Sequence, residues 1–418
     1  MSAQAEHFLM TRDRVTQVAP GVFTLGAQGN SLAVETEAGI VLVDTGPGGE
    51  KTDRMIASLR TVSDRPLLAI VYSHGHVGYN FGVDQWIAHA AQRGDPRPRI
   101  LAHARLPARY RRYRETAGLQ AWLNTRQFRT WAPADMPAHW YRMPDETYDS
   151  RMVLHGGDRD VELIHAPSET DDVTAVWVPS ERLLYGSAAA VKALPNVGTP
   201  LRTMRDPIRW AETLERLHAL SPRILVPEFG APVSDQADID DCLLLPARVL
   251  RWLHKEVIDR MNRGMGVDDI VHDIQYPAAW SGHKFLKQTY GTVDFVVRDI
   301  WRSENGWWDR NPTNLHPASP ADIGTAVLSA IADPDHVLAR ARALAADGKP
   351  QLAMHVLDLL ARGPENEACV REAQTLKAEL CEALSKSASS YVSRQLYLSA
   401  ADDLMHRPIF REGSGAIW

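Results

Sequence analysis

Short apolar runs, rich in β-branched residues and bounded by glycine and asparagine, recur through the first half of the chain. Runs of this length between turn residues predict buried strands. The expected strands are 22–25, 31–34, 39–44, 67–72, 161–164, 173–178 and 223–226. Residues 56–59 lie between two of these runs and suggest a helix.

The second half of the chain changes to a helical pattern. From about residue 245, apolar side chains recur at helical spacing. They are Val249, Trp252, Leu253, Val257 and Met261. Residues 322–405 are rich in helix formers, with glycine and proline mainly between segments, and resemble a few helical hairpins. We therefore expect a β-rich domain over residues 1–243 and a helical domain over residues 244–418.

Residues 105–150 interrupt the strand pattern with a segment rich in arginine, tryptophan, tyrosine and proline. We interpret this segment as an insertion in the first domain. It forms either a lid or wall beside a substrate, or a surface excursion without a function. Aromatic candidates for a partly apolar pocket wall are Trp131, Trp140, Tyr141, Trp307 and Trp308.

Composition narrows the class of protein. With 418 residues, the chain is long enough for two domains. Its 44% apolar and 23% charged residues are ordinary for a globular protein, and a net charge of -6 does not favour nucleic acid or an anionic membrane surface. No stretch approaches the ~18 consecutive apolar residues of a membrane helix. The start lacks a signal-like pattern, and the three cysteines lack a CxxC spacing, so we expect free thiols and a cytoplasmic protein.

The strongest chemical signal follows the predicted strand 67–72. There the chain reads Val71-Tyr72-Ser73-His74-Gly75-His76-Val77-Gly78-Tyr79. This segment resembles the HxHxDH metal motif of the metallo-β-lactamase superfamily. His74 and His76 keep the first pair of ligands, whereas Gly78 stands in the place of the aspartate and Tyr79 in the place of the last histidine.

Four further motif frames follow in the order of that superfamily. Asp44, in Val43-Asp44-Thr45-Gly46, fits the aspartate of the first motif, which orients the ligand loop. In the third motif, within residues 164–172, Glu169 takes the ligand place. In the fourth, within 183–188, Ala188 replaces the aspartate that bridges two metals, and in the fifth, within 226–230, Phe229 replaces the histidine.

The resemblance thus implies that the first-metal ligands survive as His74, His76 and Glu169, while the second-metal ligands are lost. We expect one divalent metal ion per chain. Three protein ligands leave positions open for water or substrate, as catalytic sites require. Two histidines and one carboxylate suit zinc, and they also match the facial triad of iron(II) oxygenases, so ligand type alone does not choose between Zn and Fe(II).

Three residues beside these ligands are candidate catalytic residues. His165 is expected to orient a ligand rather than to bind the metal. Tyr79 and Glu228 lie beside the vacated second site, where each serves as a general base or hydrogen-bond donor, or is merely filler.

Two other features point to one branch of the superfamily. A glutamate in the third motif is typical of the alkylsulfatase branch and of flavodiiron proteins. Residues 289–293, 297–301 and 306–312 resemble the YG…GWFDGNP pattern of the alkylsulfatase dimerisation domain, and the tail is similar to its helical part. The resemblance implies an α/β fold, an αβ/βα sandwich, followed by an all-α domain that forms a homodimer through residues 245–405.

In alkylsulfatases an Asn…Thr-Leu-Arg stretch binds the sulfate. Residues 196–202 match it with one extra residue at Pro200, so Asn196 and Arg202 are candidate anion contacts. An arginine can hold an oxyanion through two hydrogen bonds. Lys192 stands where a histidine is usual in that stretch and is a third candidate for the substrate site.

Three functions remain open at this point. We favour a one-metal hydrolase that cleaves an ester, sulfate or related, of a small organic molecule, with an anionic substrate as one option. The first alternative is a mononuclear non-haem iron oxygenase or oxidative enzyme, suggested by the ligand set. The second is a metal-free dimeric scaffold, suggested by the eroded ligands.

Overall fold

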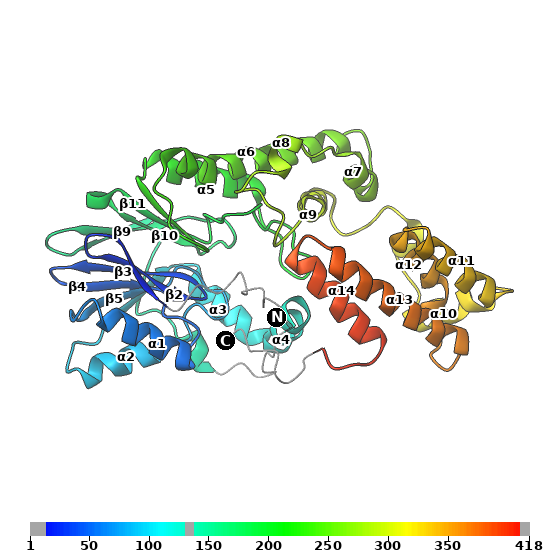
Figure 1. The fold of residues 1–418 in the computed structure, drawn as a ribbon, viewed down its shortest axis with the longest axis horizontal. Coiled ribbons are helices and arrows are strands. Elements are labelled where there is room, and N and C mark those ends of the chain that lie inside the picture. Colours follow the sequence, from blue (N-terminus) through cyan, green and yellow to red (C-terminus); the bar gives the residue numbers. More distant parts are fainter. Residues whose placement is uncertain (1–13, 130–137, 410–418) are drawn as a thin grey trace.

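The computed structural model describes residues 14–129 and 138–409. Two β-sheets pack face to face, helices cover their outer faces, and a helical array extends to one side (Figure 1). Among the described residues, no helix combines the length and the apolar composition needed to cross a bilayer.

The first sheet has seven strands in chain order. They are β1 Val15–Ala19, β2 Val22–Ala27, β3 Gly29–Thr36, β4 Gly39–Val43, β5 Leu67–Val71, β6 Arg99–His103 and β7 Glu146–Tyr148. Neighbours from β1 to β4 are antiparallel, and neighbours from β4 to β7 are parallel. The parallel pairs need crossover connections. For the first two pairs these are α1 Gly49–Arg60, between β4 and β5 in the chain, and α2 Val83–Gln92, between β5 and β6.

The second sheet has five strands in the order β12-β11-β10-β9-β8. They are β8 Arg151–His155, β9 Asp160–His165, β10 Thr174–Val178, β11 Leu183–Ser187 and β12 Ile224–Pro227. The chain crosses from β11 to the parallel β12 through α5 Pro207–Ala219. The side chain of Asp206 caps α5 by accepting from the backbone N–H of Ile208 and Arg209.

Three hydrophobic clusters explain the layers. Apolar residues of both sheets, including Val43, Val71 and Val176, fill the space between the sheets. A second cluster joins the outer face of the first sheet to α1 and α2, and a third joins the outer face of the second sheet to α5 and α6 Gln236–Met261. Strands buried on both faces read as continuous apolar runs. The expected αβ/βα sandwich with a following all-α region is confirmed.

Helices make up the rest of the described chain. They are α7 Val267–Asp273, α8 Ala278–Ser281, α9 Val293–Asn305, α10 Pro320–Ser329, α11 Pro334–Ala346, α12 Pro350–Ala361, α13 Ala368–Ser387 and α14 Tyr391–Leu404. Residues 243 and 244, the expected domain limit, lie inside α6. This helix packs on α5 and on α9, so it joins the sandwich to the helices that follow. Helices α11 to α14 pack in sequence around their own apolar cluster.

The inserted segment forms α3 Leu106–Glu115, α4 Ala117–Phe128 and the short helix η1 Ala138–Tyr141. Its expected end at residue 150 is too late, because residues 146–148 form β7 and pair with β6. Helix α4 packs against α14, far away in sequence (Figure 1). Arg126 pairs with Asp403 at 2.8 Å and Arg129 with Asp402 at 2.7 Å, so the insertion is anchored to the C-terminal helices.

Candidate metal centre

The loop after β5 carries the two histidines and is held by a buried aspartate. Asp44, directly after β4, accepts hydrogen bonds from the Ser73 backbone N–H at 2.8 Å and from Asn80 Nδ2 at 2.9 Å. Its φ of 61° is in the left-handed region. Burial raises the pKa of Asp44 to about 6, although the hydrogen bonds from Ser73, Asn80 and Tyr185 act in the opposite direction.

A second buried aspartate holds the same loop from the other sheet. Asp172 accepts from the Gly75 backbone N–H at 2.8 Å, from Thr170 Oγ1 at 2.6 Å and from Arg109 Nε at 2.7 Å. Burial alone would raise the pKa of Asp172, but the Arg109 guanidinium and the Thr170 hydroxyl hold it below its usual value. The loop is therefore fixed by hydrogen bonds to residues that follow strands of both sheets.

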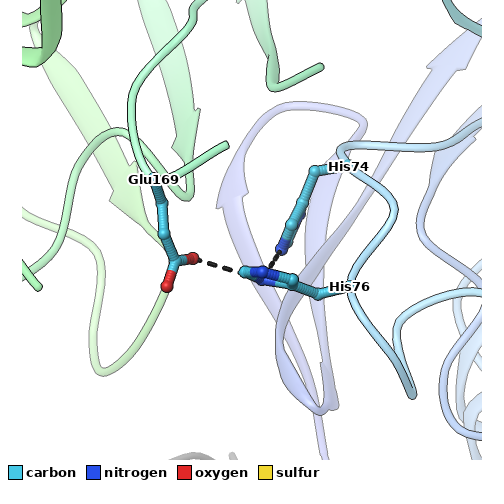
Figure 2. A group of neighbouring side chains, drawn as sticks. All are labelled: His74, His76 and Glu169. Atoms are coloured by element: carbon cyan, nitrogen blue, oxygen red, sulfur yellow. Dashed lines mark hydrogen bonds and ion pairs between the residues drawn. The ribbon is translucent and has the colours of Figure 1, made fainter. Parts of the chain in front are cut away.

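His74, His76 and Glu169 converge at this position (Figure 2). His74 Nε2 lies 3.0 Å from His76 Nδ1, which lies 3.3 Å from Glu169 Oε2. Ligands of a tetrahedral zinc ion at 2.0–2.1 Å stand about 3.3 Å apart. Among the described residues, this is the one group of three or more His, Cys, Asp or Glu side chains whose candidate ligand atoms lie within 4.8 Å of one another. The donor set fits a divalent metal ion.

The protonation states also suit a metal. Burial and the neighbouring His76 lower the pKa of His74 to about 3, and burial lowers the pKa of His76. Burial would raise the pKa of Glu169, but Arg205 and His76 lower it below its usual value. Neutral imidazoles and an ionised carboxylate are the forms that bind metals. Ser73 Oγ lies 2.9 Å from His74 Nδ1 and orients the ring so that Nε2 faces the other donors.

Tyr79 and Glu228 form a hydrogen-bonded pair next to these donors. The Tyr79 hydroxyl donates to Glu228 Oε1, which lies 4.0 Å from His74 Nε2. Burial and the charge of Glu169 raise the pKa of Glu228 well above its usual value, and burial likewise raises the pKa of Tyr79. Glu228 is therefore protonated more readily than an exposed glutamate.

A cavity of about 870 Å³ opens beside this group. Its walls come from the metal-motif loops, the insertion and the helical region, since Asn124, Phe128, Tyr290 and Arg302 all line it. Of the two interpretations of the insertion, the structure supports the wall. His76, Glu169, Tyr79 and Glu228 also line the cavity, whereas His74 is fully buried behind them.

The expected substrate contacts lie around the same cavity. Lys192, Asn196 and Arg202 all line it. Arg202 donates to Asn124 Oδ1 at 2.8 Å, and its guanidinium lies 5.5 Å from the centre of the Phe128 ring. The side chain of Asn196 accepts from Thr199, and Lys192 Nζ donates to the Ala231 carbonyl at 3.2 Å.

His165 lies apart from the other candidates. Its Nε2 is 2.9 Å from the Asp171 carbonyl, and its ring stacks on His103 with 3.7 Å between centroids. It is not among the residues that line the cavity. This placement suits a residue that positions the loop of Glu169 rather than one that meets substrate.

The prediction that five aromatic residues line the pocket was wrong for four of them. Trp140 stacks on Phe81 at 4.4 Å, Tyr141 is fully buried, and neither lines the cavity. Trp307 is 71% exposed, and Trp308 Nε1 donates to the Asn311 carbonyl outside the cavity. Trp131 is outside the described residues. Tryptophan is more often packed than functional, and here Trp140 joins the core under the first sheet.

The sequence analysis missed Arg205. This buried residue donates to Glu169 Oε1 at 2.9 Å and also to the carbonyl of Asn196. Nothing in the spacing around Arg205 separates it from an ordinary cation before a helix. Asp172 was also missed, although its place two residues after Thr170 in the third motif frame was a usable signal.

Comparison with known proteins agrees with this architecture. Residues 25–227 match the metallo-beta-lactamase superfamily model, and residues 266–407 match the alkyl sulfatase dimerisation model. A linear primary-alkylsulfatase from a Pseudomonas strain is 25% identical over 388 residues, which are 89% of this chain and 73% of the relative. An (R)-specific secondary-alkylsulfatase from Pseudomonas is 24% identical over 406 residues, covering 90% of this chain and 60% of the relative.

A solved structure shows the same fold. The stereoselective inverting sec-alkylsulfatase from Pseudomonas superposes with a TM-score of 0.81 at 20% identity, over 94% of this chain and 66% of that one. The chain thus spans about two thirds of the length of that protein. It belongs to the metallo-β-lactamase superfamily and carries an alkyl sulfatase dimerisation domain after its metallo-β-lactamase domain.

Proposed function

We propose that this protein is a hydrolase of an organic sulfate ester that uses one divalent metal ion per chain. The observation that carries the proposal is the convergence of His74, His76 and Glu169 at the wall of a cavity lined by Arg202 and Asn196. The two relatives, each named an alkylsulfatase, support sulfate ester hydrolysis by this fold.

The metal would be held by His74, His76 and Glu169. A divalent ion supplies Lewis acidity there, which lowers the pKa of a water and polarises an ester oxygen. Oε1 of Glu169 is occupied by Arg205, so Oε2 is the oxygen available to the ion. Zn and Fe(II) both accept this set.

The protein's own groups would bind the anion and move a proton. Arg202 and Asn196 would hold the sulfate oxygens at the cavity wall. Glu228 would give its proton to the ester oxygen that leaves as the alcohol, and Tyr79 would hold the carboxyl in place through their hydrogen bond. His165 would position the Glu169 loop.

The residues at the positions of the second-metal ligands support a single metal ion. The frame positions of its ligands hold Gly78, Tyr79, Ala188 and Phe229. The Tyr79 hydroxyl instead donates a hydrogen bond to Glu228, and the Ala188 methyl is buried in the apolar cluster under the second sheet. None of these four side chains offers a good metal ligand.

The mononuclear iron oxidative enzyme and the metal-free scaffold stay as alternatives. The donor geometry does not separate the first from a hydrolase, and no relative compared above carries an oxidative name. The metal-free scaffold is less favoured, because all three donor side chains are present in the protonation states that bind metals.

The dimerisation domain supports a homodimer, which light scattering at micromolar concentration tests. A cytoplasmic location stays a prediction that cell fractionation tests.

The deciding experiment measures sulfate release from alkyl sulfates by protein loaded with zinc or with iron(II), beside His76→Ala. Sulfate release that the variant lacks supports the hydrolase. Oxygen consumption with iron, without sulfate release, would favour the oxidative alternative. Neither activity, with no metal bound, would favour the scaffold.

A further inference from the structure

The cavity beside the metal donors carries an excess of positive charge. Three acidic side chains line it, namely Glu169, Asp171 and Glu228. Seven cationic side chains line it as well: Arg109, Arg112, Lys192, Arg202, Arg205, Arg209 and Arg302. A cleft lined by one sign of charge focuses the field and concentrates ligands of the opposite sign.

Only two of these cations are neutralised by nearby carboxylates. Arg109 pairs with Asp171 and with Asp172, and Arg205 pairs with Glu169. Within the described part of the chain, the other five have no carboxylate oxygen within 4.0 Å; they are Arg112, Lys192, Arg202, Arg209 and Arg302. One anionic group at Arg202 leaves four of them without a counter-charge.

Among these four cations, Arg209 has the strongest need for a hydrogen-bond partner. It lies in the first turn of α5, and its Nε is buried without a hydrogen-bond partner among the described residues. A buried donor left unpaired costs free energy, and more so in a charged group. Arg302, by contrast, is exposed to water, and Lys192 already donates to a carbonyl. Arg112 is half-buried, and none of its nitrogens is buried without a partner. Arg209 is therefore the one of these four with a buried nitrogen that lacks a partner among the described residues.

The cavity is also apolar in part. Leu119, Leu123 and Phe128 of the insertion line it, together with Leu201 and Met204 from the loop before α5. Such a mixture fits a ligand with a carbon skeleton and charged groups rather than a free inorganic ion.

We propose that the substrate carries a second anionic group, such as a carboxylate, in addition to the sulfate ester, and that Arg209 binds this second group. The proposal rests on the function proposed above, since Arg202 and Asn196 are taken to hold the sulfate. The substrate class is therefore an organic dianion, and the second charge acts in selection rather than in bond cleavage.

The test compares two ligands that cannot be hydrolysed: an alkanesulfonate and the α,ω-alkanedisulfonate of the same chain length. Isothermal titration calorimetry measures both with the metal-loaded protein. We expect the disulfonate to bind about tenfold more tightly, beyond the twofold statistical advantage of its two ends, because a charge-assisted hydrogen bond is worth at least about a factor of ten.

In Arg209→Gln the preference for the disulfonate should fall to the statistical factor. The control Arg340→Gln removes an exposed arginine of α11, away from the cavity, and should keep the wild-type preference. Equal affinity of the wild type for both ligands, after the statistical correction, overturns the proposal. So does an undiminished preference in Arg209→Gln.

The outcome is independent of catalysis. A wild-type preference for the disulfonate in a protein that releases no sulfate from any ester would refute the hydrolase and leave the dianion site standing. Sulfate release from simple alkyl sulfates without a preference between the two sulfonates would refute the dianion site alone.

Discussion

Arg205 and Glu169 form a buried ion pair in which the guanidinium meets Oε1 at 2.9 Å, while Oε2 of the same carboxylate lies 3.3 Å from Nδ1 of His76. The pair divides the two oxygens between a fixed cation and the metal donors. It also holds the pKa of Glu169 below its usual value, whereas burial alone would raise it. The positive charge of Arg205 thus acts on the donor group without being a ligand.

Glu169→Gln should therefore destabilise the metal-free protein. The neutral amide leaves the buried Arg205 without a counter-charge, which costs about 3 kcal/mol in the free energy of unfolding. Urea unfolding measures this. The matched control is Glu215→Gln, whose partner Arg251 is 42% exposed, so the loss should be below about 1 kcal/mol. Equal losses in the two variants would contradict the role of Arg205.

Metal content tests the donor group directly. We expect about one ion per chain in the wild type, because one group of three donors is present in the described chain. His76→Ala should lose it, whereas His155→Ala, which changes a 79% exposed histidine, should keep it. Elemental mass spectrometry on protein purified without chelators measures both. Two ions per chain would show that the second site still binds metal.

The pair of Tyr79 and Glu228 should affect turnover more than metal content. Glu228→Gln keeps the shape but cannot give a proton, so kcat should fall about 100-fold or more. Tyr79→Phe leaves the carboxyl without its donor and should cost about tenfold. Both variants should keep the metal of the wild type. A Glu228→Gln protein with normal kcat would reduce this glutamate to a packing residue.

The anchored insertion should control substrate binding. Arg129 follows α4 directly and pairs with Asp402 of α14, and the preceding Phe128 lines the cavity. Arg129→Gln should loosen this wall and raise KM about threefold to tenfold, with little change in kcat, since the metal donors are untouched. Arg394→Gln, on an exposed position of the same α14, is the control. An unchanged KM would mean that the apolar contacts alone hold α4.

Most of the sandwich could be predicted from the sequence, because its strands are continuous apolar runs. The run 67–72, for example, ends at the histidines, as β5 does. The start of α6 at Gln236 was missed by about nine residues, since its first turns are acidic and the apolar repeat becomes clear only later. Helices α3 and α4 were not expected either, because their sequences have little periodicity, and α4 is supported by tertiary contacts with α14.

Some residues of the site could likewise be predicted from the sequence, and others could not. His74, His76 and Glu169 lie in motif frames and could be found by spacing. The pairing of Arg205 with Glu169 could not, because it joins residues 36 positions apart through a loop of irregular backbone. The cation excess of the cavity depends on four separate segments, namely α3, the loop 188–206, α5 and α9, and is visible only in three dimensions.

Asp44 gives a prediction about pH. Burial raises its pKa from 3.8 to about 6, so the folded protein binds this proton more tightly than the unfolded chain does. Its contribution to stability is therefore complete below pH ~4 and is lost as the pH rises through ~6.

Asp44→Asn keeps an oxygen that can accept from Ser73 and Asn80, but it does not titrate. The free energy of unfolding of the wild type, measured relative to this variant in urea without metal, should fall by about 2 kcal/mol between pH 4 and pH 7. Asp347→Asn, at an exposed position after α11, is the control for loss of a surface carboxylate. A flat difference for Asp44→Asn would mean that its hydrogen bonds keep the carboxylate ionised, and the loop of His74 would then be held by a charge rather than by a neutral acid.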